Sequence, residues 1–575
     1  MSTSVTSSPA TAATWPMPLP IWPPPPTTIT LLIVMCVVPL RYSGPHRGTG
    51  VVELTSSVGQ VFTTYQPIGS FLNMSGMSSW ASYWARFGAD RPALIFEGRD
   101  VTWGQLEDSC AQIAAGLLQE GLRKGDRLGC LVRNTPEHFE VLLACSRLGV
   151  IFVPLNPLLT ARELREAAGD AELAAVVTDP SFVDVLGPLE ELVGASRIFF
   201  VGTPPDQGRA LDALREHGYQ RAELDIVASD PAMICYTSGT TGRSRGAVLT
   251  QGNMTGVAVS ASAIDGLTYR DRAIVTVPLA FTGAGVSFAV PMMYCGGSVV
   301  IRQELVPSLV LDDIENNGVS FIGVVPLVLE RLAAEPDFAD RDLSGLRIVK
   351  SGGSAVPEHL IRLYQSRGVG MVNAYGLTEG SGLNLELQAH EAIDRLGSVG
   401  IPLMGQEAKV VDLNGDPAAP GEPGELLLAG SCVMQEYWRD PASTEKTLQD
   451  GWLHTGDVAT VDEDGYFRIV DRSKDMIISG GINIYPAEVE SVLSAHPDVL
   501  EVAVIGVPDA EWGETPVACV VSSNPDLDIA SLNAFAKDQL ARYKQPRRLI
   551  LRAEPLPRGM SGKILKRELR SDVAE

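Results

Sequence analysis

The sequence predicts an α/β protein with a large N-terminal domain of layered helices and strands, followed by a small α+β C-terminal domain. The chain has 575 residues, more than one hydrophobic core usually organises. Short apolar strands alternate with amphipathic helices through most of it, the pattern of a largely parallel sheet. The last part of the chain carries its own set of helix and strand signals. These observations predict two domains of different architecture.

Globular patterning begins at about Ser78. Thr102-Trp-Gly-Gln105 is a capping box and predicts a helix. The apolar face of this helix should consist of Leu106, Cys110, Ile113, Ala114 and Leu117. Leu128–Val132 predicts a strand, and Thr135-Pro136 supplies an N-cap and a first-turn proline for the next helix. Val150–Pro154 predicts a further strand.

The C-terminal domain is predicted from a second run of signals. Pro486 opens a helix that stops before Pro497. One face of this helix should consist of Val489, Val492 and Leu493. Val499–Val507 predicts a strand, and a last helix is expected from the spacing of Leu532, Phe535, Ala536 and Leu540. We place the join near Asp471–Lys474 and divide the body into residues 78–471 and 472–575.

Residues 1–77 do not match the rest of the chain. Residues 1–40 carry no charged side chain, and a proline run occupies Pro23–Pro26. The apolar stretch Ile29–Leu40 is shorter than the roughly 20 residues of a membrane span, and no basic region precedes it as in a signal peptide. We expect a disordered extension, or a natural start at Met74 or Met77.

Composition limits the partners and the compartment. The formal net charge of −24 argues against nucleic acid, which is bound by clustered Lys and Arg. It leaves ATP and CoA open, because a few cations and backbone N–H groups hold their phosphates. The eight cysteines form no CxxC pair and no zinc-ligand spacing, so we expect buried thiols and a reducing, cytoplasmic location.

The segment from Tyr236 to Gly246 predicts a phosphate-binding loop. It reads Tyr-Thr-Ser-Gly-Thr-Thr-Gly-Arg-Ser-Arg-Gly and follows an apolar run. Its glycines allow the backbone to approach an anion, its hydroxyls and N–H groups donate hydrogen bonds, and Arg243 and Arg245 add positive charge. It is not a Walker A loop, because GxxxxGK[ST] is absent.

This loop resembles the signature loop of the adenylate-forming superfamily, YTSGTTGxPKG, with Ser244 and Arg245 in place of its proline and lysine. Arginine keeps the charge but loses the compact ammonium geometry. Further strings resemble the superfamily's motifs in its order. They are Ser351–Ala355, Asn373–Glu379, Gly451–Asp457, Tyr466–Glu490 and Arg558–Ile564. Among its members the chain is most similar to acyl-CoA synthetases, whose N-terminal domain includes a small β-barrel-like part and whose C-terminal domain is mobile.

The resemblance implies a role for each matched residue. Those implied to bind ATP are Thr237, Ser238, Gly239, Thr240, Thr241, Gly242, Arg245, Gly353, Ser354, Ala355, Asn373, Ala374, Tyr375, Gly376, Asp457 and Arg472. Tyr375 would stack on adenine, and Asp457 would accept the ribose hydroxyls. The catalytic residues would be Thr378 on the α-phosphate, Glu379 on Mg²⁺ and Lys563 beside the developing charge. Lys474 is the implied hinge, the CoA channel would include Ser479, Gly480 and Gly481, and Phe281 would line the acyl pocket.

The implied activity is that of an ATP-dependent carboxylate–CoA ligase with Mg²⁺ and coenzyme A, acting on a fatty or related organic acid. The acid would attack the α-phosphate to give acyl-AMP, and after the small domain turns about Lys474 the CoA thiolate would attack. Two alternatives stay open: an adenylation enzyme that loads a carrier protein, and an inactive nucleotide-binding relative. Arg245 and Ala280-Phe281, where relatives often have an aromatic–His pair, motivate the second. Peripheral membrane contact and a homodimer are left open.

Overall fold

The computed structural model describes residues 50–56, 59–65, 76–205, 208–220, 224–237, 244–354, 356–412, 414–472, 475–479, 482–509, 512–537, 539–559 and 564–574. The chain divides into two units, Met1–Met74 and Ser75–Glu575. The described part of the first unit is an antiparallel pair of strands, β1 (Gly50–Ser56) and β2 (Gly59–Tyr65). These strands were not predicted from the sequence, from which a disordered extension was expected here. The second unit opens with helix α2 (Ser78–Gly88), where the sequence places the start of the body.

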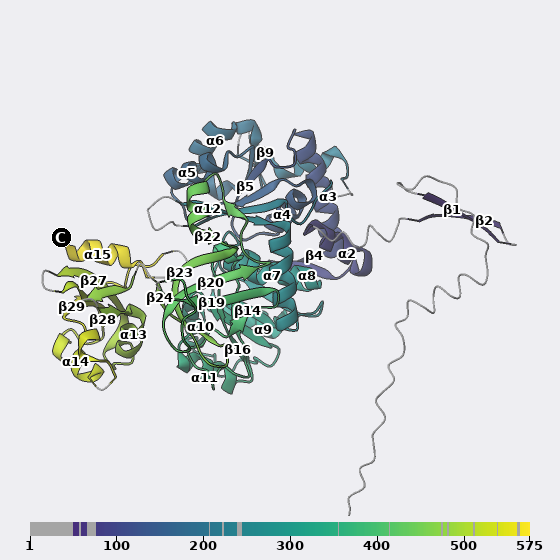
Figure 1. The fold of residues 1–575 in the computed structure, drawn as a ribbon. Helices are drawn as coiled ribbons and strands as arrows, with labels where there is room; N and C mark the ends of the chain where they lie inside the picture. The colour runs from purple at the N-terminus through teal and green to yellow at the C-terminus, as the bar shows by residue number, and fades with distance from the viewer. Residues whose placement is uncertain are drawn as a thin grey trace, which may run out of the picture. The chain divides into compact units, whose positions relative to one another are not determined.

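An eight-stranded sheet in the order β21-β11-β10-β6-β5-β7-β8-β9 carries the arms of the phosphate loop (Figure 1). Its strands are β5 (Arg127–Leu131), β6 (Ile151–Pro154), β7 (Ala175–Thr178), β8 (Ile198–Phe200), β9 (Arg209–Ala210), β10 (Pro231–Thr237), β11 (Arg245–Thr250) and β21 (Glu436–Tyr437). The pairs from β10 through β6 and β5 to β9 are parallel, and β10–β11 and β11–β21 are antiparallel.

A nine-stranded sheet in the order β18-β17-β16-β15-β14-β12-β13-β3-β4 carries the motifs that begin at Ser351 and at Asn373. Its strands are β3 (Pro92–Phe96), β4 (Arg99–Thr102), β12 (Arg272–Val275), β13 (Ser298–Ile301), β14 (Phe321–Val324), β15 (Ile348–Gly352), β16 (Gly370–Tyr375), β17 (Leu385–Leu387) and β18 (Ile401–Pro402). The run from β3 through β13, β12, β14 and β15 to β16 is parallel. The predicted parallel sheets are therefore confirmed.

Two mostly antiparallel sheets complete the fold. One consists of β19 (Gln406–Val411), β20 (Gly424–Gly430), β22 (Leu448–Gln449), β23 (Trp452–Val461) and β24 (Phe467–Arg472). The other, in the predicted small α+β domain, consists of β25 (Ile477–Ser479), β26 (Ile482–Ile484), β27 (Val499–Asp509), β28 (Gly513–Ser522) and β29 (Arg548–Arg552).

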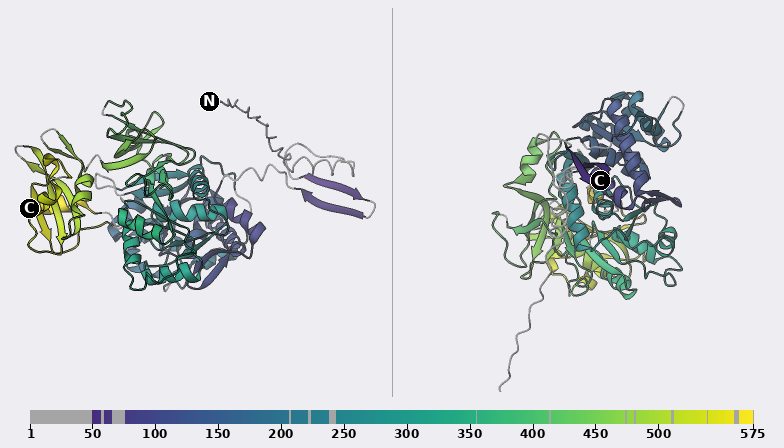
Figure 2. Two further views of the ribbon diagram at one scale, coloured as in Figure 1. Left: turned by 90° about the horizontal axis from the view of Figure 1, so that it is seen from below. Right: turned by 90° about the vertical axis from the view of Figure 1, so that its right-hand side faces the viewer.

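Helices of the body pack around the strands, as two further views show (Figure 2). They are α3 (Trp103–Gln119), α4 (Pro136–Leu148), α5 (Ala161–Ala171), α6 (Gly187–Val193), α7 (Gln251–Ile264), α8 (Val290–Cys295), α9 (Pro307–Asn316), α10 (Pro326–Ala333), α11 (Glu358–Ser366) and α12 (Pro441–Thr447). The small domain has α13 (Pro486–Leu493), α14 (Ile529–Ala536) and α15 (Lys566–Ala574). Short turns of helix are η2 (Pro180–Val185), η3 (Ala195–Arg197), η4 (Leu211–His217), the π-helical η5 (Gly283–Ala289), η6 (Thr378–Gly380) and η7 (Arg542–Lys544).

Most of the predicted helix signals are confirmed, with two differences. Helix α3 has the full capping box of Thr102 and Gln105, and the apolar face predicted for it is buried. Thr135 occupies the N-cap of α4, but its side chain makes no capping hydrogen bond. Helix α14 ends at Ala536, so Leu540 was wrongly placed in it. Leu540 is nevertheless buried among the core residues of the small domain, and its N–H donates to the carbonyl oxygen of Ala536 at 2.8 Å.

The described residues include no membrane-spanning helix and no disulfide. No helix among them is long and apolar enough to cross a bilayer. Their cysteines are unpaired, and all are buried except Cys295, which is partly exposed. This agrees with the expected buried thiols.

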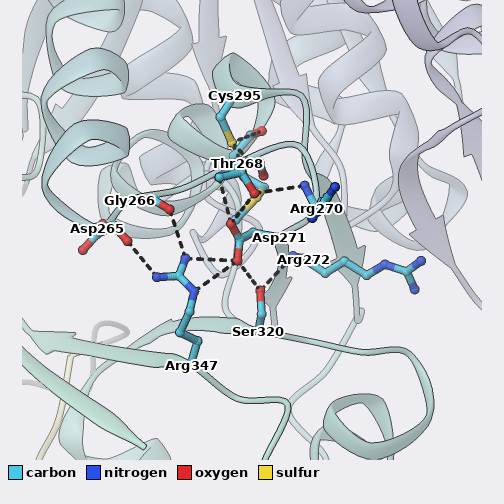
Figure 3. Close-up of polar contacts among 10 residues, drawn as sticks. Asp265, Gly266, Thr268, Arg270, Asp271, Arg272, Cys295, Ser320 and Arg347 are labelled. Carbon is cyan, nitrogen blue, oxygen red and sulfur yellow. Dashed lines mark hydrogen bonds and ion pairs between the residues drawn. The ribbon is translucent and has the colours of Figure 1, made fainter.

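The amino ends of three neighbouring parallel strands are joined by a polar cluster around Asp271 (Figure 3). Asp271, Ser320 and Arg347 each directly precede a strand, β12, β14 and β15 respectively. Oδ1 of Asp271 accepts hydrogen bonds from Ser320 Oγ at 2.9 Å and from Arg347 Nη2 at 3.0 Å. Burial acts to raise the pKa of Asp271, but hydrogen bonds from Ser320, Thr268 and Arg347 outweigh it and lower the pKa. The carboxylate therefore stays charged and ties the three strands together.

A second charged cluster lies inside the body. Lys350, in β15, is completely buried, and its Nζ lies 2.6 Å from Asp265 Oδ2 and 2.5 Å from Glu386 Oε2. Burial and the charge of Asp265 raise the pKa of Glu386 to about 7, although Lys350 opposes the shift. Lys350 thus joins the end of α7, strand β15 and strand β17 through one cation.

Substituting this cation should destabilise the body. Lys350→Met should cost about 3–5 kcal/mol near neutral pH, because it leaves Asp265 and Glu386 buried without a counter-charge. The loss should be smaller at about pH 6 than at about pH 8, because Glu386, whose pKa is raised to about 7 even beside Lys350, is protonated at the lower pH and then needs no counter-charge. Thermal unfolding at two pH values measures both effects. The matched control is Lys446→Met at an exposed lysine, and an equal loss in the two variants would contradict the assignment.

Candidate functional site

Several of the predicted nucleotide residues lie at the carboxyl ends of parallel strands. Strand β15 ends at Gly352 and continues into Gly353 and Ser354, while β16 ends at Tyr375 and continues into η6 with Thr378 and Glu379. The chain that leaves β12 reaches Phe281 before η5. Because these strands are parallel neighbours, their following segments meet at one edge, where ligands of α/β sheets bind.

The base of the phosphate loop is held on both arms. Thr237 and Arg245 are paired across β10 and β11, and the Thr237 hydroxyl donates to the Arg245 carbonyl oxygen at 3.4 Å. The Tyr236 hydroxyl donates to Asp170 Oδ2 at 2.8 Å, which fixes the entry to the loop. Both ends of the loop are therefore anchored to the eight-stranded sheet.

The chain is tightly packed where β15 and β16 end, beside the predicted ATP-binding residues. A Cβ atom at Gly376 would lie 2.2 Å from the carbonyl oxygen of Gly382, so only glycine fits there. Gly353 has φ of +80°, a left-handed conformation that favours glycine. Asn373 is buried, with its amide nitrogen donating to the Ser398 carbonyl oxygen at 2.5 Å, and the adjacent Ala374 pairs with Gly352. The strand end is thus fixed for any ligand that binds it.

Three predicted ATP-binding residues are brought together from two sheets. The Tyr375 hydroxyl donates to Asp457 Oδ2 at 2.6 Å, and Asp457 is 2% exposed. Asp457 is also the cross-strand partner of Arg472 on β24. The proposed adenine platform and the proposed ribose acceptor therefore form one unit.

The Thr378–Glu379 turn is held by side chains from two other segments. Thr282 Oγ1 donates to Thr378 Oγ1 at 3.1 Å. The Tyr437 hydroxyl donates to Glu379 Oε1 at 2.6 Å, and the Met434 N–H donates to the Glu379 carbonyl oxygen at 2.8 Å. The orientation of both side chains is thereby set before any substrate binds.

Burial and the charge of Glu379 raise the pKa values of two neighbouring groups, Cys235 and Tyr437. Burial raises the pKa of the Cys235 thiol to about 12, although a hydrogen bond with Thr282 opposes the shift. Burial, followed by the charge of Glu379, raises the pKa of Tyr437 above its ordinary range. Both groups therefore stay neutral at physiological pH, and Tyr437 stays a hydrogen-bond donor.

Thr282 and Tyr437 were not predicted from the sequence. Thr282 directly follows Phe281, the residue predicted to line the acyl pocket. This position in the chain was the one sequence feature from which a role for Thr282 could have been predicted. Tyr437 lies 58 residues from Glu379 in the chain, and no local pattern links the two. Such contacts arise from tertiary packing.

Several predicted residues lie outside the described part of the chain. They are Ser238, Gly239, Thr240, Thr241, Gly242, Ala355, Lys474, Gly480, Gly481 and Lys563. For Arg472 only the backbone pairing is described. Ser479 is a buried residue of β25 that pairs with Ile482 and Gly513. The roles assigned to these residues stay predictions.

The donor set around Glu379 fits a magnesium ion that is shared with a nucleotide. No group of three or more His, Cys, Asp or Glu side chains suited to a metal occurs in the described residues. Mg²⁺ is usually held by one or two carboxylates together with phosphate oxygens and water. Glu379 has Oε1 occupied by Tyr437, whereas no described hydrogen bond reaches Oε2. One carboxylate oxygen is thus available for a cation.

Comparison with known families agrees with this arrangement. The AMP-binding enzyme family matches residues 81–438, which is more than half of the chain. The chain belongs to the AMP-binding enzyme family. The AMP-binding enzyme C-terminal domain matches residues 488–563.

Relatives of this AMP-binding enzyme include several CoA ligases. Feruloyl-CoA synthase from Amycolatopsis sp is 38% identical over 496 residues, covering 86% of this chain and 98% of the relative. Indoleacetate–CoA ligase from Aromatoleum aromaticum is 34% identical over 501 residues, covering 87% and 98%. The structure of o-succinylbenzoate CoA synthetase from Bacillus subtilis with the acyl-adenylate OSB-AMP is similar at a TM-score of 0.77 and 32% identity, covering 85% of this chain and 97% of that one. The predicted family and fold are therefore confirmed.

The contact between Thr282 and Thr378 gives a test of the site. Thr282→Val keeps the shape but removes the hydroxyl that bonds Thr378, so the turnover number of this AMP-binding enzyme should fall about tenfold. Because the substitution leaves the other contacts of the nucleotide in place, the KM for ATP should change less. Steady-state pyrophosphate release measures both constants. Thr255→Val, which removes a hydroxyl bonded within α7, is the matched control, and equal effects of the two variants would refute the role.

Proposed function

We propose that this AMP-binding enzyme activates an apolar carboxylic acid, either fatty or aromatic, as its acyl-adenylate and transfers the acyl group to coenzyme A. The carboxylate–CoA ligase reaction, with ATP and Mg²⁺, is that of its relatives. The choice of acid, the roles of individual residues and the domain movement are the proposed parts.

One observation carries the choice of acid: the chain segment that is bonded to the Thr378–Glu379 turn, and that would form one wall of the acyl pocket, has no charged side chain. Thr282 makes this bond, and residues 277–301, which surround it in sequence, include no Asp, Glu, Lys or Arg. The segment after β14, residues 325–329, is also uncharged. A second carboxylate would find no cation on this wall, whereas an apolar body would be accommodated by Phe281 and its neighbours.

The described residues support a division of labour in the first half-reaction. Tyr375 and Asp457 would hold the adenosine, and Thr378 would bind the α-phosphate that the substrate carboxylate attacks. Mg²⁺ supplies charge neutralisation for the departing pyrophosphate, and Glu379 would hold it through Oε2. Lys563 would stabilise the charge that develops between the carboxylate and the α-phosphate.

The second half-reaction would need a different geometry in the same site. We assign residues 472–575 to a domain that turns about Lys474, withdrawing Lys563 and bringing Ser479, Gly480 and Gly481 to the pantetheine arm. The CoA thiolate then attacks the acyl carbon and AMP leaves with the bonding electron pair. Rotation of this domain would let one pocket carry out both half-reactions, because it exchanges the groups that face the substrate.

We also propose a cellular location and two modes of association for the enzyme. The unpaired cysteines of the described residues support a cytoplasmic location. A homodimer and peripheral membrane contact are further proposals, which sedimentation and vesicle co-pelleting of the full chain would test.

The function is tested by pyrophosphate release with a panel of acids, each with and without CoA. Short, medium and long fatty acids, benzoate, cinnamates and dicarboxylates form the panel. Turnover with a fatty or aromatic acid that depends on CoA is the expected result. Turnover with dicarboxylates alone would refute the apolar pocket, and CoA-indifferent release would refute the CoA ligase.

The role of Lys563 predicts a separation of the two half-reactions. Lys563→Ala should reduce acyl-AMP formation by at least about a hundredfold, because a cation beside the transition state is lost. The same variant should retain thioester formation from supplied acyl-AMP and CoA. Rapid-quench measurement of each half-reaction tests this, with Lys537→Ala at an exposed lysine as the control. Normal overall activity of Lys563→Ala would overturn the mechanism.

A further inference from the structure

The buried Tyr437 connects the arm of the phosphate loop to the turn that carries Glu379. Its hydroxyl donates to Glu379 Oε1 at 2.6 Å, and its side chain is almost completely buried. The guanidinium carbon of Arg245 lies 4.3 Å from the centroid of its ring. Arg245, Tyr437 and Glu379 are thus in consecutive contact.

The backbone around Tyr437 is held on both sides, so its ring has little freedom. Strand β21 pairs with β11, with Tyr437 opposite Ala247. The Trp438 N–H donates to the Gly246 carbonyl oxygen at 2.7 Å, and the Tyr437 N–H donates to Thr444 Oγ1 at 2.9 Å. The hydroxyl is therefore directed at Glu379 by a fixed scaffold.

The hydrogen bond from Tyr437 selects one orientation of the Glu379 carboxylate. A free carboxylate rotates about its last side-chain bond and exchanges its two oxygens. With Oε1 bonded to Tyr437, Oε2 is the oxygen that remains for a cation, since no described donor reaches it. Substituting a residue that holds a metal ligand in this way typically lowers the metal affinity about tenfold to a hundredfold.

The stacked contact gives Arg245 a second task besides its charge. A planar guanidinium can lie over an aromatic face, which a compact ammonium does less well. Nε of Arg245 is buried and has no hydrogen-bond acceptor among the described residues. The side chain is therefore positioned by the ring of Tyr437 rather than by an ion pair with a described carboxylate.

We propose that Tyr437 is a positioning residue that orients Glu379 toward the metal of Mg·ATP, and that Arg245 fixes Tyr437 by stacking on its ring. The inference rests on the proposed role of Glu379 as the metal ligand. It assigns a function to a tyrosine outside the motif strings named in the sequence and to the arginine that replaces the family's lysine.

The first test removes only the hydroxyl of Tyr437. Tyr437→Phe should raise the free Mg²⁺ concentration at half-maximal activity about tenfold, while the KM for the acid stays within about twofold. Binding of Mn²⁺ in the presence of ATP, followed by electron paramagnetic resonance without the acid, should weaken by a similar factor. The matched control is Tyr466→Phe, which removes a hydroxyl bonded to Glu391 at another carboxylate and should change neither quantity.

The second test separates the charge of Arg245 from its stacking. Arg245→Lys keeps the charge, so its effect on metal affinity measures the loss of stacking. Combined with Tyr437→Phe it should give less than the product of the two single effects, because both act through the same carboxylate. Fully multiplicative effects would refute the link between Arg245 and Tyr437.

The outcomes distinguish this inference from the proposed function. If the wild type releases pyrophosphate with Mg²⁺ and Tyr437→Phe keeps wild-type metal affinity, the positioning role is wrong and the function stands. If no acid of the panel gives release with the wild type, the proposed function itself fails. Equal loss of Mn²⁺ binding in Tyr437→Phe and Tyr466→Phe would assign the effect to general destabilisation and overturn the inference.

Discussion

The site depends on how three parallel strands are fixed at the opposite end of the sheet. Asp271, Ser320 and Arg347 join the amino ends of β12, β14 and β15, and Arg347 also donates to the Asp265 carbonyl oxygen at 2.8 Å. The side chain of Asp265 forms an ion pair with Lys350, which lies in β15 three residues after Arg347. Charges inside the body thus set the strands in register, and their carboxyl ends present the nucleotide residues. The ion pair of Lys350 and Asp265 is costly to break because both side chains are buried away from water.

One segment joins the two large sheets beside the proposed catalytic turn. The residues after β20 bond the turn of Glu379 through Met434 and then pair with β11 as β21. Ser381 Oγ donates to the Cys432 carbonyl oxygen at 2.6 Å within the same contact. The phosphate loop and the Thr378–Glu379 turn belong to different sheets, so this segment fixes the spacing between them. A displacement here would alter the distance between phosphate and metal ligand directly.

The sequence allowed prediction of the local elements and the motif residues, but not of the groups that orient them. The capping box of Thr102 and Gln105 is encoded within four consecutive residues, and the structure has it. The ion pairs of Lys350 span 85 and 36 residues of chain, and a lone lysine in an apolar strand gives no sign of its partners. Tyr437 likewise lies outside every motif string noted in the sequence, and no local pattern links it to Glu379. Motifs record the residues that meet a ligand, whereas their supports are recorded only by the three-dimensional packing.

The replacement of lysine by Arg245 bears on whether the chain has kept its chemistry. An inactive relative would be free to lose the contacts that orient a metal ligand, since burying a tyrosine hydroxyl and part of a guanidinium costs free energy without adding a hydrophobic contact. The structure instead places the guanidinium against Tyr437 and the hydroxyl on Glu379. The substitution is thereby accommodated by a neighbour that serves the same carboxylate. This favours an altered but working phosphate site over a lost one, because the departure from the family pattern is matched by a specific contact.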